Sequence, residues 1–213
     1  LIRENDPIAG ISREYQYRDG GQLYYEVETP YTTGDLSWSI PTVQYTGDSN
    51  WEDMLIAVNG QSITRDAIGN MLSYNGYTYT WEHGRELATM SKSGDTWTFT
   101  YDANGMRTKK VKTNSSGTAT DTYTYVYNGS QLSQMTKNST VLNFFYDGEG
   151  RPAYFTYNNA TYYYVTNLQG DVIAILYSNG TMAASYHYDA YGALVEIGGP
   201  SGASLGVMNP LTY

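Results

Sequence analysis

The stretch Phe99-Thr100-Tyr101-Asp102-Ala103-Asn104-Gly105 is the unit that the chain repeats. Two close copies are Tyr146-Asp147-Gly148-Glu149-Gly150-Arg151 and Tyr188-Asp189-Ala190-Tyr191-Gly192. Weaker copies are Tyr17-Arg18-Asp19-Gly20-Gly21, Arg65-Asp66-Ala67-Ile68-Gly69, Trp81-Glu82-His83-Gly84-Arg85, Tyr127-Asn128-Gly129 and Asn167-Leu168-Gln169-Gly170. The glycines at positions 84, 105, 129, 150, 170 and 192 are 21, 24, 21, 20 and 22 residues apart. A period of this length is typical of repeat architectures, in which each unit buries an apolar face against its neighbours.

Each unit has the features of a strand followed by a tight turn. Aromatic residues alternate with threonine before the turn, which predicts a strand with its aromatic rings on one face. The aspartate ends the strand because its carboxylate accepts hydrogen bonds from backbone N–H groups two residues on. The glycine three residues later supplies a positive φ. The residues expected to define the repeat are Tyr101, Asp102, Gly105, Tyr146, Asp147, Gly150, Arg151, Gly170, Tyr188, Asp189 and Gly192.

These units predict an all-β fold of antiparallel hairpins. An alternative, unrelated turns in an ordinary sandwich, explains the shared offsets less well. Further hairpins are indicated by Asn59-Gly60, Asn75-Gly76 and Asn179-Gly180, which favour tight two-residue turns. The polar stretch from Asn114 to Thr120 reads as a mobile hairpin tip, and Glu52 to Val58 as a short helix.

The chain is expected to divide into three segments. Residues 1–58 hold an irregular segment with degenerate repeats, and residues 59–197 hold the regular repeat sheet. Residues 198–213 begin a linker, in which the run from Gly198 to Gly202 is a loop. Because the chain begins with Leu1, it reads as a piece of something longer.

Composition narrows the class of protein. The net charge is −9, from 21 acidic and 12 basic residues, which argues against a nucleic-acid partner. The chain has no cysteine, which excludes a disulfide framework and a cysteine-based metal site. Its longest apolar run, Val172 to Tyr177, is far shorter than the roughly 18 residues of a membrane span and predicts a buried strand.

Residues with catalytic or ligating chemistry are few. The two histidines, His83 and His187, lack the spacing of a zinc site and are expected to be structural or solvated. Ser201 has neither a nucleophile-elbow context nor an assigned base. Lys109, Lys110 and Lys112 form a basic cluster that reads as a solvated strand edge.

The acidic residues follow the turns. Asp102 to Gly105 and Asp147 to Gly150 lack the alternating oxygen ligands of a calcium loop. A pair of carboxylates for glycoside hydrolysis is disfavoured, because the acids occur at repeat spacing. We therefore expect no catalytic, cofactor or metal site and no enzymatic activity.

The repeated Tyr-Asp-x-x-Gly units resemble the YD repeats of the RHS family. The run from Tyr162 to Ile175 resembles the RHS-associated core of secreted, wall-associated proteins of Gram-positive bacteria. So do the run from Tyr188 to Leu194 and Asn209-Pro210-Leu211-Thr212-Tyr213. The likeness covers most of the chain from about Asn59 onward.

The resemblance implies a continuous sheet that spirals into a hollow shell. In that family the shell encloses or displays a C-terminal domain, often a toxin, and some members cleave themselves at the end of the core. The chain would then be a structural section of a secreted or wall-associated bacterial protein. Its partners would be the rest of its parent chain, or further copies of itself through open sheet edges. An alternative function is a carbohydrate-binding surface module that uses exposed tyrosine and tryptophan for cell-surface glycans.

Overall fold

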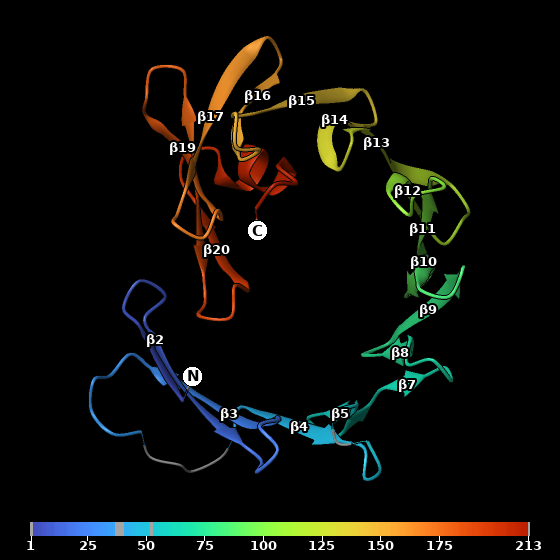
Figure 1. Ribbon diagram of the computed structural model, residues 1–213, viewed down its shortest axis with the longest axis vertical. Helices are drawn as coiled ribbons and strands as arrows, with labels where there is room; N and C mark the ends of the chain where they lie inside the picture. Colours follow the sequence, from blue (N-terminus) through green and yellow to red (C-terminus); the bar gives the residue numbers. More distant parts are fainter. Residues whose placement is uncertain (1, 37–40, 52, 213) are drawn as a thin grey trace. The chain divides into compact units, whose positions relative to one another are not determined.

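The computed structural model describes residues 2–36, 41–51 and 53–212, and these residues form mostly antiparallel strands (Figure 1). The strands pair in chain order in two sheets, one from β1 to β6 and one from β7 to β20. The chain comprises two compact units, Leu1–Thr96 and Trp97–Tyr213. The all-β antiparallel fold expected from the repeats is confirmed.

The first unit contains the whole first sheet and the beginning of the second. The first sheet holds β1 (Arg3–Asp6), β2 (Ile11–Tyr17), β3 (Leu23–Pro30), β4 (Val43–Gly47), β5 (Leu55–Val58) and β6 (Gln61–Ser62). The second sheet begins with β7 (Thr64–Arg65), β8 (Met71–Tyr74), β9 (Tyr77–Glu82) and β10 (Glu86–Lys92). Between the two sheets lies the buried Ile63, whose N–H donates to the Ile56 carbonyl at 2.7 Å. Residues 1–58 hold strands β1 to β5. A boundary after residue 58, between an irregular segment and the regular repeat sheet, stays a prediction.

The second unit contains the later run of strands, the first of which begins just before the boundary of the unit. These are β11 (Asp95–Tyr101), β12 (Arg107–Thr113), β13 (Ala119–Asn128), β14 (Gln131–Lys137), β15 (Thr140–Tyr146), β16 (Pro152–Tyr157), β17 (Ala160–Thr166), β18 (Val172–Tyr177), β19 (Met182–Tyr188) and β20 (Leu194–Gly198). A single π-helical turn, η1 (Gly202–Gly206), follows β20. Among the described residues no helix is long and apolar enough to cross a membrane.

The core of the second unit lies on one face of its sheet. Leu142, Phe155 and Ile175 are completely buried there, and the Phe155 ring stacks on Tyr162 with centroids 5.1 Å apart. Phe144, opposite Phe155 in the register, belongs to the same cluster. The apolar run from Val172 to Tyr177 forms β18, as expected, and contributes two fully buried side chains.

The residues after β20 pack onto this core. Leu205 of η1 is 4% exposed and belongs to the core cluster, so this part of the tail packs onto the sheet. The linker over residues 198–213 stays a prediction. The glycines of η1 permit this close approach, because a Cβ on Gly206 would lie 2.6 Å from the Ile197 side chain. Tyr213, the last residue of the run Asn209-Pro210-Leu211-Thr212-Tyr213, lies outside the described residues.

The local turns test the hairpin predictions. Asn59 and Gly60 have φ of 49° and 73°, and Asn75 and Gly76 have 49° and 77°, so both hairpins are confirmed as turns with two left-handed residues. The hairpin at Asn179-Gly180 is also present, with a different turn: only Gly180 has a positive φ, and its N–H donates to the Tyr177 carbonyl at 2.9 Å.

The predicted helix from Glu52 to Val58 is wrong. Leu55–Val58 forms β5, which pairs with β4 on one side and β6 on the other. The tight turn at Asn59 returns the chain directly beside β5, and this pairing outweighs the weak local helix signal. Glu52 itself lies outside the described residues.

Candidate functional site: the repeat turn and its tyrosine

The turn after Tyr101 is held by the aspartate side chain and by the backbone. Asp102 Oδ1 accepts from the backbone N–H groups of Asn104 at 2.9 Å and Met106 at 3.0 Å. The Asp102 N–H donates to the Met106 carbonyl at 2.9 Å, and the Gly105 N–H donates to the Asp102 carbonyl at 3.0 Å. Gly105 has a φ of 76°, a conformation that side chains with a Cβ resist.

The same turn recurs along both units. In each copy the side-chain oxygen accepts from the N–H groups two and four residues on, at 2.8 to 3.1 Å. The accepting residues are Asp66, Asp102, Asn114, Asp147, Asn167 and Asp189. Asparagine serves as well as aspartate, so the turn needs an oxygen acceptor and not a negative charge. The copy at Asn114 was missed by sequence reasoning, which took its serines for an irregular tip.

Arg151 adds a second contact at one copy. The backbone N–H of Arg151, and then its guanidinium, lower the pKa of the Asp147 carboxyl. The Arg151 Nε lies 3.0 Å from Asp147 Oδ2, and its Nη2 lies 3.0 Å from Glu149. The groups are solvent-exposed, so these ion pairs add little to stability.

At three copies of the repeat, the tyrosine near the end of the strand donates its hydroxyl to the backbone. Tyr127 donates to the Arg107 carbonyl at 3.0 Å, and Tyr146 donates to the Leu132 carbonyl at 2.9 Å. Tyr188 lies 2.8 Å from the Val172 carbonyl and 2.9 Å from that of Thr212. Arg107, Leu132 and Val172 lie at the start of the preceding strand, whereas Thr212 belongs to the tail after η1.

Two further copies of the motif carry an aromatic residue at the strand end, Trp81 and Tyr101. Trp81 occupies the position of the tyrosine in the first unit, and its Nε1–H donates to the Met71 carbonyl at 2.7 Å. Tyr101, like Tyr127, Tyr146 and Tyr188, is half-buried. The aromatic residue at the strand end therefore fastens adjacent strands, which is a structural use of its polar group.

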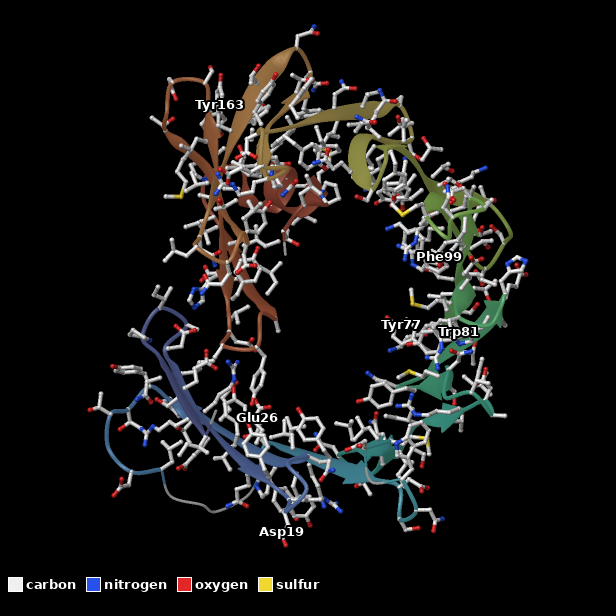
Figure 2. The ribbon with its side chains drawn as sticks, in the orientation of Figure 1. Asp19, Glu26, Tyr77, Trp81, Phe99 and Tyr163 are labelled. Atoms are coloured by element: carbon white, nitrogen blue, oxygen red, sulfur yellow. The ribbon has the colours of Figure 1, made fainter. Side chains whose placement is uncertain are left out.

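Open aromatic rings lie on the opposite face of the second unit. The Phe145 and Tyr154 rings stack with centroids 4.5 Å apart, and Tyr163 follows on the next strand at 6.0 Å from Tyr154. Phe145 is 40% exposed and Tyr163 is 45% exposed. Figure 2 labels Tyr163. These rings, rather than the motif tyrosines, are where a flat ligand could stack.

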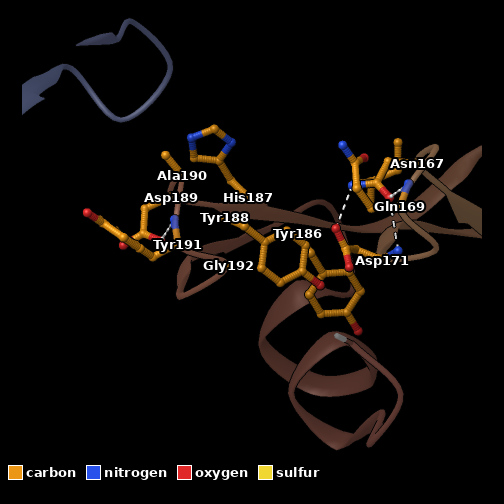
Figure 3. A pocket seen from close by; sticks show the side chains of 11 residues that line it. Asn167, Gln169, Asp171, Tyr186, His187, Tyr188, Asp189, Ala190, Tyr191 and Gly192 are labelled. Atoms are coloured by element: carbon orange, nitrogen blue, oxygen red, sulfur yellow. Dashed lines mark hydrogen bonds between the residues drawn. The ribbon is translucent and has the colours of Figure 1, made fainter. Parts of the chain in front are cut away.

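The residues considered for chemistry are placed in structural contacts. His83 is exposed, with its Nδ1 2.9 Å from Glu86. His187 lines a pocket of about 630 Å³ beside Asp171 and Asp189 (Figure 3). Asp171 accepts from Asn167 Nδ2 at 2.7 Å, and Asp189 serves its own turn.

The remaining candidates are likewise engaged. The Ser201 hydroxyl lies 2.6 Å from the Tyr177 hydroxyl, and no His, Asp or Glu contacts it in the hydrogen bonds of the described chain. Nor do the described residues include a group of three His, Asp or Glu side chains that could hold a metal ion. The lysines of β12 separate: Lys109 is exposed, whereas Lys110 is half-buried with its Nζ 4.2 Å from the Tyr123 ring. The expectation that Lys110 belongs to a solvated edge is therefore wrong, because strand alternation turns it toward the aromatic face.

A buried polar network fastens the tail, and sequence reasoning missed it. Asn209 is 5% exposed; its Oδ1 accepts from the Tyr164 hydroxyl at 2.7 Å, and its Nδ2 donates to the Tyr186 hydroxyl at 3.1 Å. The Tyr186 hydroxyl donates to the Gly206 carbonyl at 2.8 Å. Asn209 also contacts both backbone groups of Leu211. The signal available in the sequence was Asn209 itself, a polar residue in a mostly apolar tail, which indicates a buried hydrogen-bonding role.

Known proteins resemble this chain in sequence. No family model matches the chain. It is 34% identical over 147 residues to the tRNA3(Ser)-specific nuclease WapA of Bacillus spizizenii, and 33% identical over 147 residues to the tRNA nuclease WapA of Bacillus subtilis strain 168. The chain is related to the RHS/YD-repeat proteins. Each match covers 66% of this chain and spans 6% of the relative.

Solved structures show the same fold as this YD-repeat chain. The Tc holotoxin pore of Photorhabdus luminescens has a TM-score of 0.70 at 17% identity, covering 95% of this chain and 10% of that one. A TcdB2-TccC3-TEV structure has a TM-score of 0.70 at 18% identity, covering 95% and 11%. The likeness in fold extends over the early strands, where the sequence likeness to YD repeats is thin.

The repeat turn at Asp147 predicts that Gly150→Ala lowers the stability of the fold. Gly150 has a φ of 83°, and a Cβ there would lie 3.1 Å from the Gln131 side chain. We expect a loss of about 1–2 kcal/mol in the free energy of unfolding, measured by urea denaturation. Gly148→Ala is the matched control, because its Cβ meets nothing within 4 Å. Equal midpoints for the two variants would contradict the assigned role of Gly150.

The buried tyrosines predict a loss of stability in alkali. Burial raises the pKa of Tyr125 and of Tyr188 to about 12. Unfolded tyrosine titrates near about pH 10, so above that pH the unfolded chain releases protons that the folded chain keeps. The contribution is complete below about pH 10 and is lost as the pH rises toward about 12. Urea midpoints should fall across that window, and less steeply for Tyr125→Phe; a constant midpoint would refute the burial of these phenols.

Proposed function

We propose that this chain is a non-catalytic wall section of an RHS-type β-shell in a longer, secreted or wall-associated bacterial protein that encloses or presents an effector. The observation that carries the proposal is the use of the motif's polar groups. The turn acids bond to backbone N–H groups within their own turns, and the strand-end tyrosines bond to the backbone of the adjacent strand, as a structural repeat requires.

The relatives supply the context for the effector. Two of them are named as tRNA nucleases, and this chain spans 6% of their length. Nuclease chemistry needs placed acid–base groups or metal ions, and the acids at the repeat positions here serve turns. We therefore assign any enzymatic activity of the parent protein to a part other than this chain.

The glycan-binding alternative is not favoured. The motif tyrosines are half-buried and hydroxyl-bonded, so the repeat positions do not offer the open aromatic faces that sugar stacking needs. The relatives in sequence and fold include toxins and toxin components, which favour the shell function.

The terminal strands predict self-association of the isolated chain. In the described sheet β20 has β19 as its one strand neighbour, and its Leu194 and Val195 side chains are 42% and 37% exposed. An unpaired edge of this kind pairs with further strands. Light scattering should show a mass that rises with concentration, and less so for Val195→Lys. A monomer at every concentration would argue that other segments cover the edges.

Protease protection in the parent protein tests the proposed function. The native parent should yield an effector region that resists trypsin, and Phe155→Ala, which loosens the core of the wall, should make that region sensitive at lower denaturant. Phe145→Ala, on the other face, is the control. An effector region that is cleaved equally in the native protein and in both variants would refute enclosure.

A further inference from the structure

Cations cover the aromatic face of β11 to β13 in the second unit. The Lys110 Nζ lies 4.9 Å from the Trp97 ring centroid and 4.2 Å from that of Tyr123. The Arg107 guanidinium lies 4.9 Å from the ring of Phe99, a side chain labelled in Figure 2. From β14, Lys137 approaches the Tyr123 ring at 5.3 Å. We call the set Trp97, Phe99, Arg107, Lys110, Tyr123 and Lys137 the basic–aromatic patch.

Positive charge in this patch exceeds the negative charge that neutralises it. Lys137 pairs with Asp121 at 3.5 Å, and the same carboxylate partly offsets the lowered pKa of Lys110, so one carboxylate serves two of the three cations. Burial, and then the charges of Arg107 and Lys137, lower the pKa of Lys110. Repulsion among three cations is a cost that an anionic partner would remove. Such a concentration stands out in a chain of net charge −9.

The patch lies on the face that the chain already uses to hold a polypeptide. Tyr123 and Tyr125 pack against the core cluster, and Leu205 of the tail belongs to that cluster. The tail covers the face near β18 and β19, through contacts such as the Tyr188 hydroxyl to the Thr212 carbonyl. At the patch the cations stay accessible: Arg107 is exposed, and the Lys137 side chain is 38% exposed.

We propose that the basic–aromatic patch docks an acidic polypeptide segment of the same parent protein, with its carboxylates against Arg107, Lys110 and Lys137. The proposal rests on the proposed function, in which this wall section contacts other parts of its parent chain. A polypeptide is favoured over a nucleic acid because ammonium groups already occupy the ring faces on which unpaired bases would stack.

Binding of a fluorescent decaglutamate peptide to the 213-residue chain tests this docking site. At about 20 mM salt, anisotropy should show binding that weakens as salt is added. Lys110→Met, which keeps an unbranched side chain of similar length, should weaken binding about fivefold or more. Lys109→Met is the matched control, since it removes the same charge from an exposed neighbour, and should change binding less than about twofold. Asp121→Asn should tighten binding, because it removes the competing carboxylate.

Three results would overturn the docking site as proposed. These are no binding of the peptide, equal losses for Lys110→Met and Lys109→Met, or tighter binding of a single-stranded oligonucleotide with the same dependence on Lys110. Circular dichroism melts of each variant show whether a loss reflects unfolding, and Asp121→Asn gives a test that requires a gain. The two proposals can fail separately. If the peptide does not bind, the docking site is refuted but the protease-protection result for the wall section is unaffected. If protection fails, the wall section is refuted but the measured affinity for the peptide is unaffected.

Discussion

Replacing Phe155 by alanine should cost about 3–5 kcal/mol of the free energy of unfolding. Phe155 is completely buried, and its ring contacts Tyr162 at a centroid distance of 5.1 Å and Tyr164 at 5.2 Å. Phe144, from the neighbouring strand, is 6.1 Å away. The variant leaves a cavity between three strands that cannot close without breaking their register, so the loss is near the upper range for a core residue.

Phe145→Ala is the matched control for this core prediction. It makes the same change on the neighbouring strand, on the opposite face, where the ring is 40% exposed and stacks on Tyr154. We expect it to cost about 1 kcal/mol, from the lost stacking. Urea denaturation followed by tyrosine fluorescence measures both. Similar losses for the two variants would mean that the face assigned to the core is wrong.

Asn209→Leu should cost about 3 kcal/mol, the second-largest effect. The change removes the acceptor for the Tyr164 hydroxyl and the donor to the Tyr186 hydroxyl, in a site where Asn209 is 5% exposed. Burial raises the pKa of the Tyr164 phenol, because little solvent reaches its hydroxyl. An unpaired buried polar group costs more than its hydrogen bond contributed.

A double-mutant cycle separates this network from general damage. Tyr164→Phe should be less costly in the Asn209→Leu background than in the wild type, because the shared hydrogen bond is already lost. Asn128→Leu, at an exposed strand end, should stay within about 0.5 kcal/mol of the wild type. Additive effects of the two network changes would contradict the proposed coupling between tail and sheet.

Much of the fold could be predicted because the repeat is a local signal. The turn at Asp102 is closed by atoms within four residues, so residue type and spacing suffice to indicate it. The same holds for the two-residue turns at Asn59 and Asn75, whose left-handed residues favour asparagine and glycine. Asn114 was missed although it obeys the same rule, because its neighbouring serines suggested an irregular tip.

The features that could not be predicted depend on distant residues. The partner of Tyr164 is Asn209, 45 positions away, and no sequence spacing indicates that contact. Lys110 was assigned to a solvated edge because the sequence does not show which face of β12 meets Trp97.

A density map of the intact parent protein tests the wall-section account most directly. We predict that β20 is paired along its open edge with a further strand of the same polypeptide, and that the effector lies on the face that carries Phe155 and the basic–aromatic patch. A map in which β20 ends the sheet in solvent, with the effector on the Phe145 side or detached from the sheet, would contradict the account.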